Sequence, residues 1–408
     1  MITDTVSVGV PLIGWSGLSL GSIYWSAQKM PPAQRLGAAA RHLRPVAREP
    51  PAAPAGAAAA PAEESSPDAP PVPFVDVAQF RERGFCVVKN MLRDEDLKLV
   101  ERDYGVLVNA QAQDWLAAGH LTTTHADLPF DKRLAAIAAD LPQAVVEDEL
   151  RTFVHSIDTM TARCRGTFDF FFSPGMLAAV EQIIGPEITL NPIQHIRPYI
   201  PHRYGGGYGT TTWHQVRLVR LIGQSPSAHS PSAHSPSPIP RRRLGLTRDS
   251  SPQDQAVTQA DADGVEIITC WIPFTNSTVE NGALRILTDV SHAEDLVIGH
   301  HDDDEIAEIW PGATPVDCVL ERGDAVLISA FTPHRGTENV SDTVRWSMDL
   351  RFQRTGTPTG RPAHPAFILQ SEADPGSVQD SFDEWCVRWV EGHENVRSGK
   401  FPHGHRTE

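Results

Sequence analysis

Two histidines, one acid and one arginine in this chain could together form a metal site. The second histidine, His334, ends the segment LISAFTPH, and Arg345 follows it by eleven residues. The first is His214, and Asp254 would stand two residues after it if residues 216–253 were looped out or absent. On a strand, side chains two residues apart point to the same face, so such a pair can grip one ion. Two histidines and a carboxylate are the ligand set that suits iron(II) in oxygenases.

The arginine predicts a second component of the site. A dicarboxylate co-substrate needs a cation in fixed geometry, and a guanidinium supplies a bidentate fork. Arg345 meets this need, and Ser347 lies two residues later on the same expected strand face. The alternative for Arg345 alone is a structural salt bridge. Its spacing from His334 favours the co-substrate role.

Residues 216–253 do not share the character of the rest of the chain. They contain a tandem SPSAH repeat and an Arg triplet. Their six Arg and one Asp give +5, so the remainder of the −16 chain sums to −21. One interpretation is a disordered surface loop, which costs little entropy to close. The interpretation that we favour is a translated intron, because Val codons begin with GT, the Gln253 codon can end in AG, and removal joins TTWHQ to DQAVTQ in frame.

The elements that must position these residues change character along the chain. Residues 1–72 are rich in Ala and Pro and predict a disordered tail. Helical spacing follows Asp94, an expected N-cap, and helices are also expected at 147–164 and 174–185. After residue 187, short β-branched runs separated by turn residues indicate an all-β sandwich or barrel. We expect one domain over residues 73–370 and a helical or irregular extension over 371–408.

Composition excludes several classes of function. A net charge of −16 is poorly suited to nucleic acid, since phosphate contacts need clustered Lys and Arg. No stretch reaches the roughly 20 apolar residues of a membrane span. The five cysteines are widely spaced and form no CxxC pair, which argues against a disulfide framework. We therefore expect an intracellular, cytoplasmic protein; an organelle leader, suggested by arginines between residues 35 and 48, is the alternative.

Several stretches resemble the phytanoyl-CoA dioxygenase family between about residues 74 and 367, outside the insert. They include RERGFCVVKNMLRDEDL, NPIQHIRP, TTWHQ followed by D, CWIPFTNSTVENGALRILTDVSH and ERGDAVLISAFTPHRGTENVSDTVRWSMDLRFQ. The resemblance implies a mainly β fold with flanking helices, the double-stranded β-helix (jelly roll, cupin-like). It implies iron(II) held by His214, Asp254 and His334, and 2-oxoglutarate held by Arg345. Ser347 and Gln194 would line the co-substrate pocket, although Gln194 is equally well explained as a buried structural amide.

By this resemblance the chain is a dioxygenase that hydroxylates or otherwise oxidises a C–H bond of a small organic substrate. Dioxygen and 2-oxoglutarate would be consumed, and succinate and CO2 released. One alternative is a catalytically impaired form that arises from faulty splicing or from a wrongly drawn gene, because the sequence as written is His-Gln-Val at residues 214–216. A non-redox cupin-like binding protein is another. In related halogenases a small residue replaces the acid, but Val216 is bulkier than the residues used there.

Two further clusters have simple structural explanations. Glu280–Gly282 predicts a turn in which Gly282 supplies unusual backbone angles. The run His300 to Asp304 predicts a solvated acidic loop rather than a second metal site. No motif identifies the substrate, because pocket-lining loops carry none.

Overall fold

The computed structural model describes residues 72–205, 212–214, 260–262, 264–288, 290 and 301–398. The expected tail up to residue 71, the insert 216–253 and the expected ligand Asp254 lie outside the described residues. The prediction of a 73–370 domain with its interruption therefore stays a prediction.

Helices dominate the first third of the described chain. In order they are α3 Val77–Arg83, α4 Asp94–Ala117, α5 Phe130–Asp140, α6 Gln143–Val145, the π-helical η1 Val146–Leu150, α7 Arg151–Ser156, α8 Arg165–Phe170 and α9 Pro174–Ile184. The expected spacing in α4 is confirmed, since Leu97, Val100, Tyr104 and Leu107 are all buried. The expected N-cap is displaced by one residue: Arg93 is the N-cap, and Asp94 opens the helix.

The helix expected over residues 147–164 is only partly formed. Helical structure runs through η1 and α7 but ends at Ser156. A loop follows in which the Asp158 carboxylate accepts hydrogen bonds from the backbone of Ile196 and the ring of His195. These bonds to a distant strand replace the helical ladder, which sequence periodicity could not anticipate.

The larger sheet has six antiparallel strands in the order β1-β6-β3-β8-β2-β9. Their bounds are β1 Phe85–Val88, β6 Ala325–Ser329, β3 Ile267–Pro273, β8 Arg345–Arg354, β2 Ile188–Tyr199 and β9 Phe367–Gln370. The smaller sheet has the order β5-β4-β7, with β5 Thr314–Cys318, β4 Leu284–Thr288 and β7 His334–Gly336. The short elements η2 His202–Tyr204, η3 Ala260–Ala262 and η4 Pro375–Ser377 lie in connecting segments.

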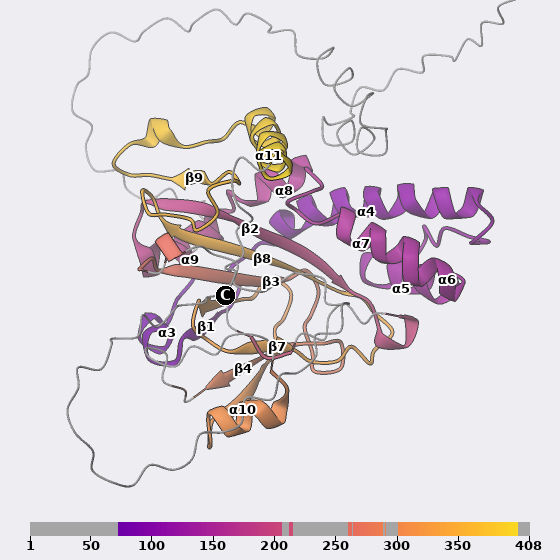
Figure 1. The fold of residues 1–408 in the computed structure, drawn as a ribbon, viewed down its shortest axis with the longest axis horizontal. Helices are drawn as coiled ribbons and strands as arrows, with labels where there is room; N and C mark the ends of the chain where they lie inside the picture. The colour runs from indigo at the N-terminus through magenta and orange to yellow at the C-terminus, as the bar shows by residue number, and fades with distance from the viewer. Residues whose placement is uncertain are drawn as a thin grey trace, which may run out of the picture.

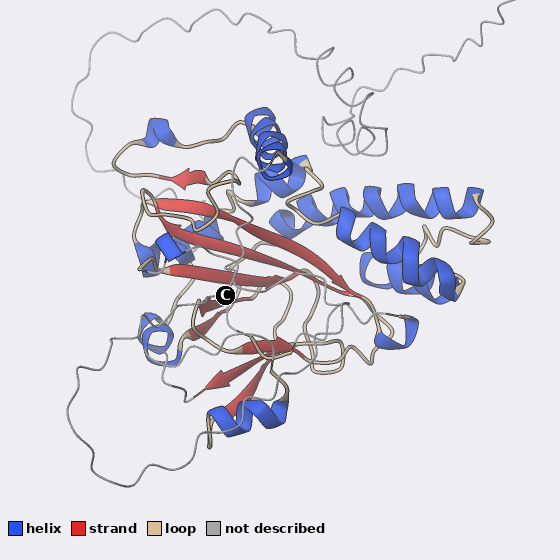
Figure 2. Cartoon of the chain, in the orientation of Figure 1, coloured by secondary structure: helices blue, strands red, loops and turns tan. Residues whose placement is uncertain are grey.

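The helices cover one face of the larger sheet, and the smaller sheet lies on the opposite side. Figure 1 shows α4, α8 and α11 (Phe382–Arg397) on the first side, and β4, β7 and α10 (Asp303–Ile309) on the second. Figure 2 shows the same separation by colour, with the strands in red lying between helical groups. The predicted class, mainly β with flanking helices in a jelly roll, is confirmed.

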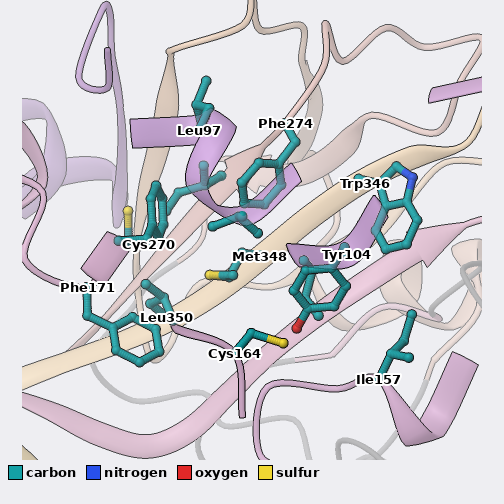
Figure 3. Packing of buried hydrophobic residues seen from close by; sticks show 14 of the residues in the cluster. Leu97, Tyr104, Ile157, Cys164, Phe171, Cys270, Phe274, Trp346, Met348 and Leu350 are labelled. Atoms are coloured by element: carbon teal, nitrogen blue, oxygen red, sulfur yellow. The ribbon is translucent and has the colours of Figure 1, made fainter. Parts of the chain in front are cut away.

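Strand β8 explains how the layers are held together. Its first four even-numbered residues join the main hydrophobic core against the helices; they are Trp346, Met348, Leu350 and Phe352, each with no exposed surface. Figure 3 shows Met348 and Leu350 among Leu97, Tyr104 and Phe171 of the helical layer. Because neighbouring residues on a strand point to opposite faces, the odd-numbered residues must face the smaller sheet. Burial therefore dictates which β8 side chains are available to a site.

Within the expected C-terminal extension, the structure describes the helix α11, and the bounds of the extension stay a prediction. Ser381 caps α11, and the helix buries Trp385 and Trp389 completely. All five cysteines are buried and carry free thiols. Among the described helices, none combines the length and apolarity that a membrane crossing requires.

Candidate metal centre

His214 and His334 lie on adjacent backbone segments in the smaller sheet. The His214 N–H donates to the His334 carbonyl at 3.1 Å, and the His334 N–H donates to the His214 carbonyl at 3.0 Å. His334 also opens β7, which pairs with β4 at Ile286. The sheet thus brings together two histidines that are 120 positions apart in the sequence.

Both imidazoles are oriented in the same way. Nδ1 of His214 lies 2.9 Å from the Thr212 carbonyl, and Nδ1 of His334 lies 2.9 Å from the Thr332 carbonyl. A carbonyl oxygen only accepts, so each Nδ1 carries a proton and Nε2 is the ring nitrogen left to act as a ligand. The ring centroids are 4.4 Å apart. Two rings on adjacent positions of one ion, with metal–nitrogen bonds of about 2.1 Å, would have centroids roughly 4.5 Å apart.

Burial keeps the second imidazole in its ligand form. His334 is 8% exposed, and its removal from water, reinforced by His214, lowers its pKa to about 3. A metal ion needs the neutral ring, so no proton has to be displaced from His334 near neutral pH.

Trp213 anchors the short segment that carries His214. Its backbone pairs with His301 in both directions, and its indole N–H donates to Asp303 at 2.7 Å. The guanidinium of Arg335 lies over the indole ring, with the carbon 5.4 Å from the centroid, and also pairs with Asp303 at 3.1 Å. The position of His214 therefore depends on the start of α10.

The prediction of a loop at His300 to Asp304 was wrong in part, because α10 begins at Asp303. His300 lies outside the described residues, but Asp302 caps α10 by a reciprocal bond pair with Glu305. Asp302 followed three residues later by Glu305 is a capping-box pattern, which the sequence interpretation missed.

A pocket opens between the two sheets beside the histidines. It encloses about 650 Å³ of space, part of which is open to solvent. Its lining includes both histidines together with Arg197, Pro198, Tyr199, Thr269, Trp271, Leu284, Ile328, Gly336, Arg345, Ser347, Asp349 and Arg351. All four odd-numbered β8 residues from 345 to 351 are present, as the strand alternation requires.

Arg345 is held between two aromatic rings. Its guanidinium carbon lies 4.9 Å from the Tyr199 centroid and 5.1 Å from that of Trp271, and it donates to the Gly282 carbonyl. Burial lowers the pKa of Arg345 to about 10, so the side chain stays a cation at neutral pH. Its Nε–H has no hydrogen-bond partner among the described residues. A buried donor in this state is prepared to meet an acceptor.

The turn at Gly282 has the conformation expected from the sequence. Its φ is +94°, which favours glycine, and a Cβ there would overlap the Tyr199 ring. Gly282 thus serves both the turn and the close packing around Arg345.

The other expected site residues are placed as follows. Ser347 is 2% exposed and lines the pocket. Gln194 is fully buried but is not among the pocket-lining residues, and its amide donates to the Asn191 carbonyl at 3.1 Å. Within the described ranges, no three His, Cys, Asp or Glu side chains converge to hold a metal. Two expected ligands are thus together, and the third, Asp254, lies outside the described residues.

Several pocket residues were not singled out from the sequence. On β2 and β3 these are Arg197, Tyr199, Thr269 and Trp271, and on β8 they are Asp349 and Arg351. The alternation Arg-Trp-Ser-Met-Asp-Leu-Arg was the available signal, because one polar face opposite one apolar face marks a strand between a core and a pocket.

One part of the chain, which includes His334 and Arg345, matches a known family model. Residues 248–347 match the family model of phytanoyl-CoA dioxygenase (PhyH). The match confirms the resemblance over that range, which includes His334 and Arg345 and begins beyond His214. No curated protein matches the chain.

Solved structures with detectable similarity are distant. One is described as a non-heme monooxygenase, ThoJ in its apo form, with a TM-score of 0.40, 15% identity, and coverage of 79% of this chain and 99% of that one. A second is the non-heme alpha ketoglutarate dependent carbocyclase SnoK from nogalamycin biosynthesis. Its TM-score is 0.35 and its identity 15%, and the match covers 74% of this chain and 87% of that one. A third is described as CytC3 with Fe(II) and alpha-ketoglutarate. Its TM-score is 0.33 and its identity 17%, and the match covers 75% of this chain and 92% of that one.

Proposed function

Because residues 248–347 carry a domain of the phytanoyl-CoA dioxygenase family, we propose that the chain is a non-haem iron(II), 2-oxoglutarate-dependent oxygenase. Its substrate would be a small organic molecule oxidised at a C–H bond. The observation that carries the proposal is the imidazole pair: two rings with centroids 4.4 Å apart, each with Nδ1 turned to a backbone carbonyl, in one pocket with Arg345.

His214, His334 and Asp254 would hold the ion. Iron(II) bound there would supply the activation of dioxygen, with 2-oxoglutarate leaving as succinate and CO2. The chain's own contribution begins with the carbonyls of Thr212 and Thr332, which keep the protons on Nδ1 and the rings in position. Loss of such a hydrogen-bond partner of a ligand typically lowers metal affinity or activity by about 10–100-fold.

Arg345 would bind the distal carboxylate of 2-oxoglutarate. The rings of Tyr199 and Trp271 hold its guanidinium in place, so little side-chain freedom is lost when the anion binds. The unpartnered Nε–H and the nearby Ser347 hydroxyl would donate to the carboxylate. Leu284 and Ile328 make part of the wall apolar, which limits water around the bound acid.

The direct test is release of succinate from 2-oxoglutarate. It should be measured for the full chain and for a form lacking residues 216–253, each with iron(II), oxygen and a panel of candidate substrates. Substrate-dependent succinate from either form, lost in His334→Ala and kept in His202→Ala, is the expected result; His202 is an exposed residue outside the pocket. Failure of both forms to turn over any panel member, despite bound metal, would count against the oxygenase.

A second candidate is a catalytically impaired form of the same enzyme. It is favoured by Val216, which stands in the position of the acid and cannot ligate a metal. The metal content of the two forms separates the candidates. Iron bound stoichiometrically only after removal of residues 216–253 would support impairment, and equal iron in both would exclude it. A non-redox binding protein would bind metal yet give no calorimetric signal with 2-oxoglutarate and Mn(II).

A further inference from the structure

Strand β8 carries two buried arginines into the same pocket. Arg345 and Arg351 are both 5% exposed, and both line the pocket. They are six residues apart on one strand, so their Cα atoms lie roughly 20 Å apart at about 3.3 Å per residue. Arg345 donates to the Gly282 carbonyl, whereas a guanidinium nitrogen of Arg351 donates to the Ile193 carbonyl of β2 at 3.4 Å. The two guanidinium groups therefore serve different parts of the pocket lining.

The histidine pair separates the two arginines. The Arg345 guanidinium reaches Gly282, just before β4, whereas His334 pairs with Ile286 further along that strand. Arg351 stands six residues further along β8 than Arg345, opposite Thr269 of β3, at the other end of this row of pocket residues. A substrate would approach there if Arg345 holds the co-substrate.

Thr269 stands directly beside Arg351. The two residues are register partners on β3 and β8, and both line the pocket. Thr269 is 2% exposed, and its hydroxyl has no hydrogen-bond partner among the described residues. Buried hydroxyls normally have a partner, so this one indicates a ligand atom that completes it. A guanidinium and a hydroxyl that line one pocket can donate to the two oxygens of one carboxylate.

The charges around this position also favour an anion. The Asp349 carboxylate has an oxygen 3.6 Å from an Arg197 nitrogen, while Arg351 donates to the Ile193 carbonyl and pairs in register with Thr269 of β3. A further arginine, Arg361, lies near Arg351; burial and that neighbouring charge lower the pKa of Arg361 to about 10. A buried cation with a second, half-buried cation nearby is stabilised when an anion binds beside it.

We infer that Arg351 and Thr269 form a second anion subsite, which binds a carboxylate group of the substrate while Arg345 holds the co-substrate. As a substrate subsite it rests on the proposed oxygenase function. The substrate class that follows is a carboxylic acid, anchored by its carboxylate and presenting a carbon between the two arginines to the metal position.

The test uses matched acid and amide probes on the full chain. Octanoate and octanamide, and benzoate and benzamide, are titrated calorimetrically into protein holding Mn(II) and 2-oxoglutarate without oxygen. The acid of at least one pair should bind about tenfold or more tightly than its amide. Arg351→Gln should abolish that preference, and Thr269→Val should reduce it several-fold. Arg354→Gln, an exposed arginine on the same strand, should leave it unchanged.

The outcomes distinguish this inference from the proposed function. No preference for either acid in the unmodified chain, or an undiminished preference in Arg351→Gln and Thr269→Val, would overturn the subsite. Competition between the acid and 2-oxoglutarate would do the same, because it would place the acid at Arg345. Acid binding without any 2-oxoglutarate binding would keep the subsite and reject the oxygenase. Melting temperatures of the variants identify a loss due to misfolding, in which case Thr269→Val, an isosteric change, decides.

Discussion

His214 and His334 exchange backbone hydrogen bonds in both directions, so their imidazoles leave the smaller sheet side by side. This relationship fixes the distance between the rings through the sheet ladder rather than through flexible side chains. A metal ion therefore meets two ligands that are already placed, and little ordering entropy is lost on binding.

Loss of either ring should abolish tight metal binding. We expect His334→Ala and His214→Ala each to weaken Mn(II) binding by at least about 100-fold, since removal of a direct ligand should exceed the loss of an outer partner. Calorimetry and metal analysis after gel filtration measure this. His202→Ala should bind like the unmodified chain because that side chain is exposed and outside the pocket. Unchanged affinity in both ligand variants would refute the site.

Arg345 should control 2-oxoglutarate affinity without affecting the metal. Truncation of a buried partner in a charge pair costs about 2–5 kcal/mol, so Arg345→Leu should raise the Kd for 2-oxoglutarate by a factor of roughly 30 to several thousand. Arg345→Lys should recover only part of this, because an ammonium cannot form the planar fork. Arg354→Gln is the control on the same strand. A normal Kd in Arg345→Leu would assign this arginine a purely structural role.

Gly282 should be needed for packing beyond its backbone angle. Gly282 and Gly312 have φ values of +94° and +91°, but a Cβ would overlap Tyr199 only at Gly282. Gly312→Ala should therefore cost about 1 kcal/mol from the backbone alone, and Gly282→Ala roughly 3 kcal/mol. Urea unfolding measures both. Equal costs at the two positions would show that the Tyr199 contact contributes nothing.

Buried neutral histidines should make the metal-free protein sensitive to acid. The pKa is about 3 for His334 and about 4 for His364, in each case lowered first by burial, against an ordinary 6.5. The unfolded chain then binds more protons between about pH 4 and 6.5, so stability falls as pH falls through this window, by up to about 1.4 kcal/mol per unit for each histidine. Urea unfolding in the presence of a chelator measures the slope.

A single substitution tests that assignment. His364→Gln should reduce the slope of unfolding free energy against pH by up to about 1.4 kcal/mol per unit, because the glutamine amide does not titrate. If His364→Gln gave the same slope as the unmodified chain, the half-buried His364 would not be a source of the acid sensitivity.

Much of the fold was predictable because its signals are local. The buried residues Leu97, Val100, Tyr104 and Leu107 repeat at helical spacing, and the β8 residues alternate between apolar and polar. The helix expected through residue 164 was wrong from residue 157 onward, because Asp158 bonds to the distant strand β2. The role of His301 and Asp303 was also hidden, since their partner Trp213 is about 90 positions earlier in the chain.

The sequence by itself determined which residue types could bind metal and co-substrate, the similarity of residues 248–347 to a family model, and the polar face of β8, because spacing and alternation are properties of short segments. Only the tertiary structure decided that His214 and His334 are neighbours, that Tyr199 and Trp271 enclose Arg345, and that Thr269 accompanies Arg351. Those pairs arise from strand order and from packing of one sheet against another. Such contacts join distant parts of the chain, and no local pattern encodes them.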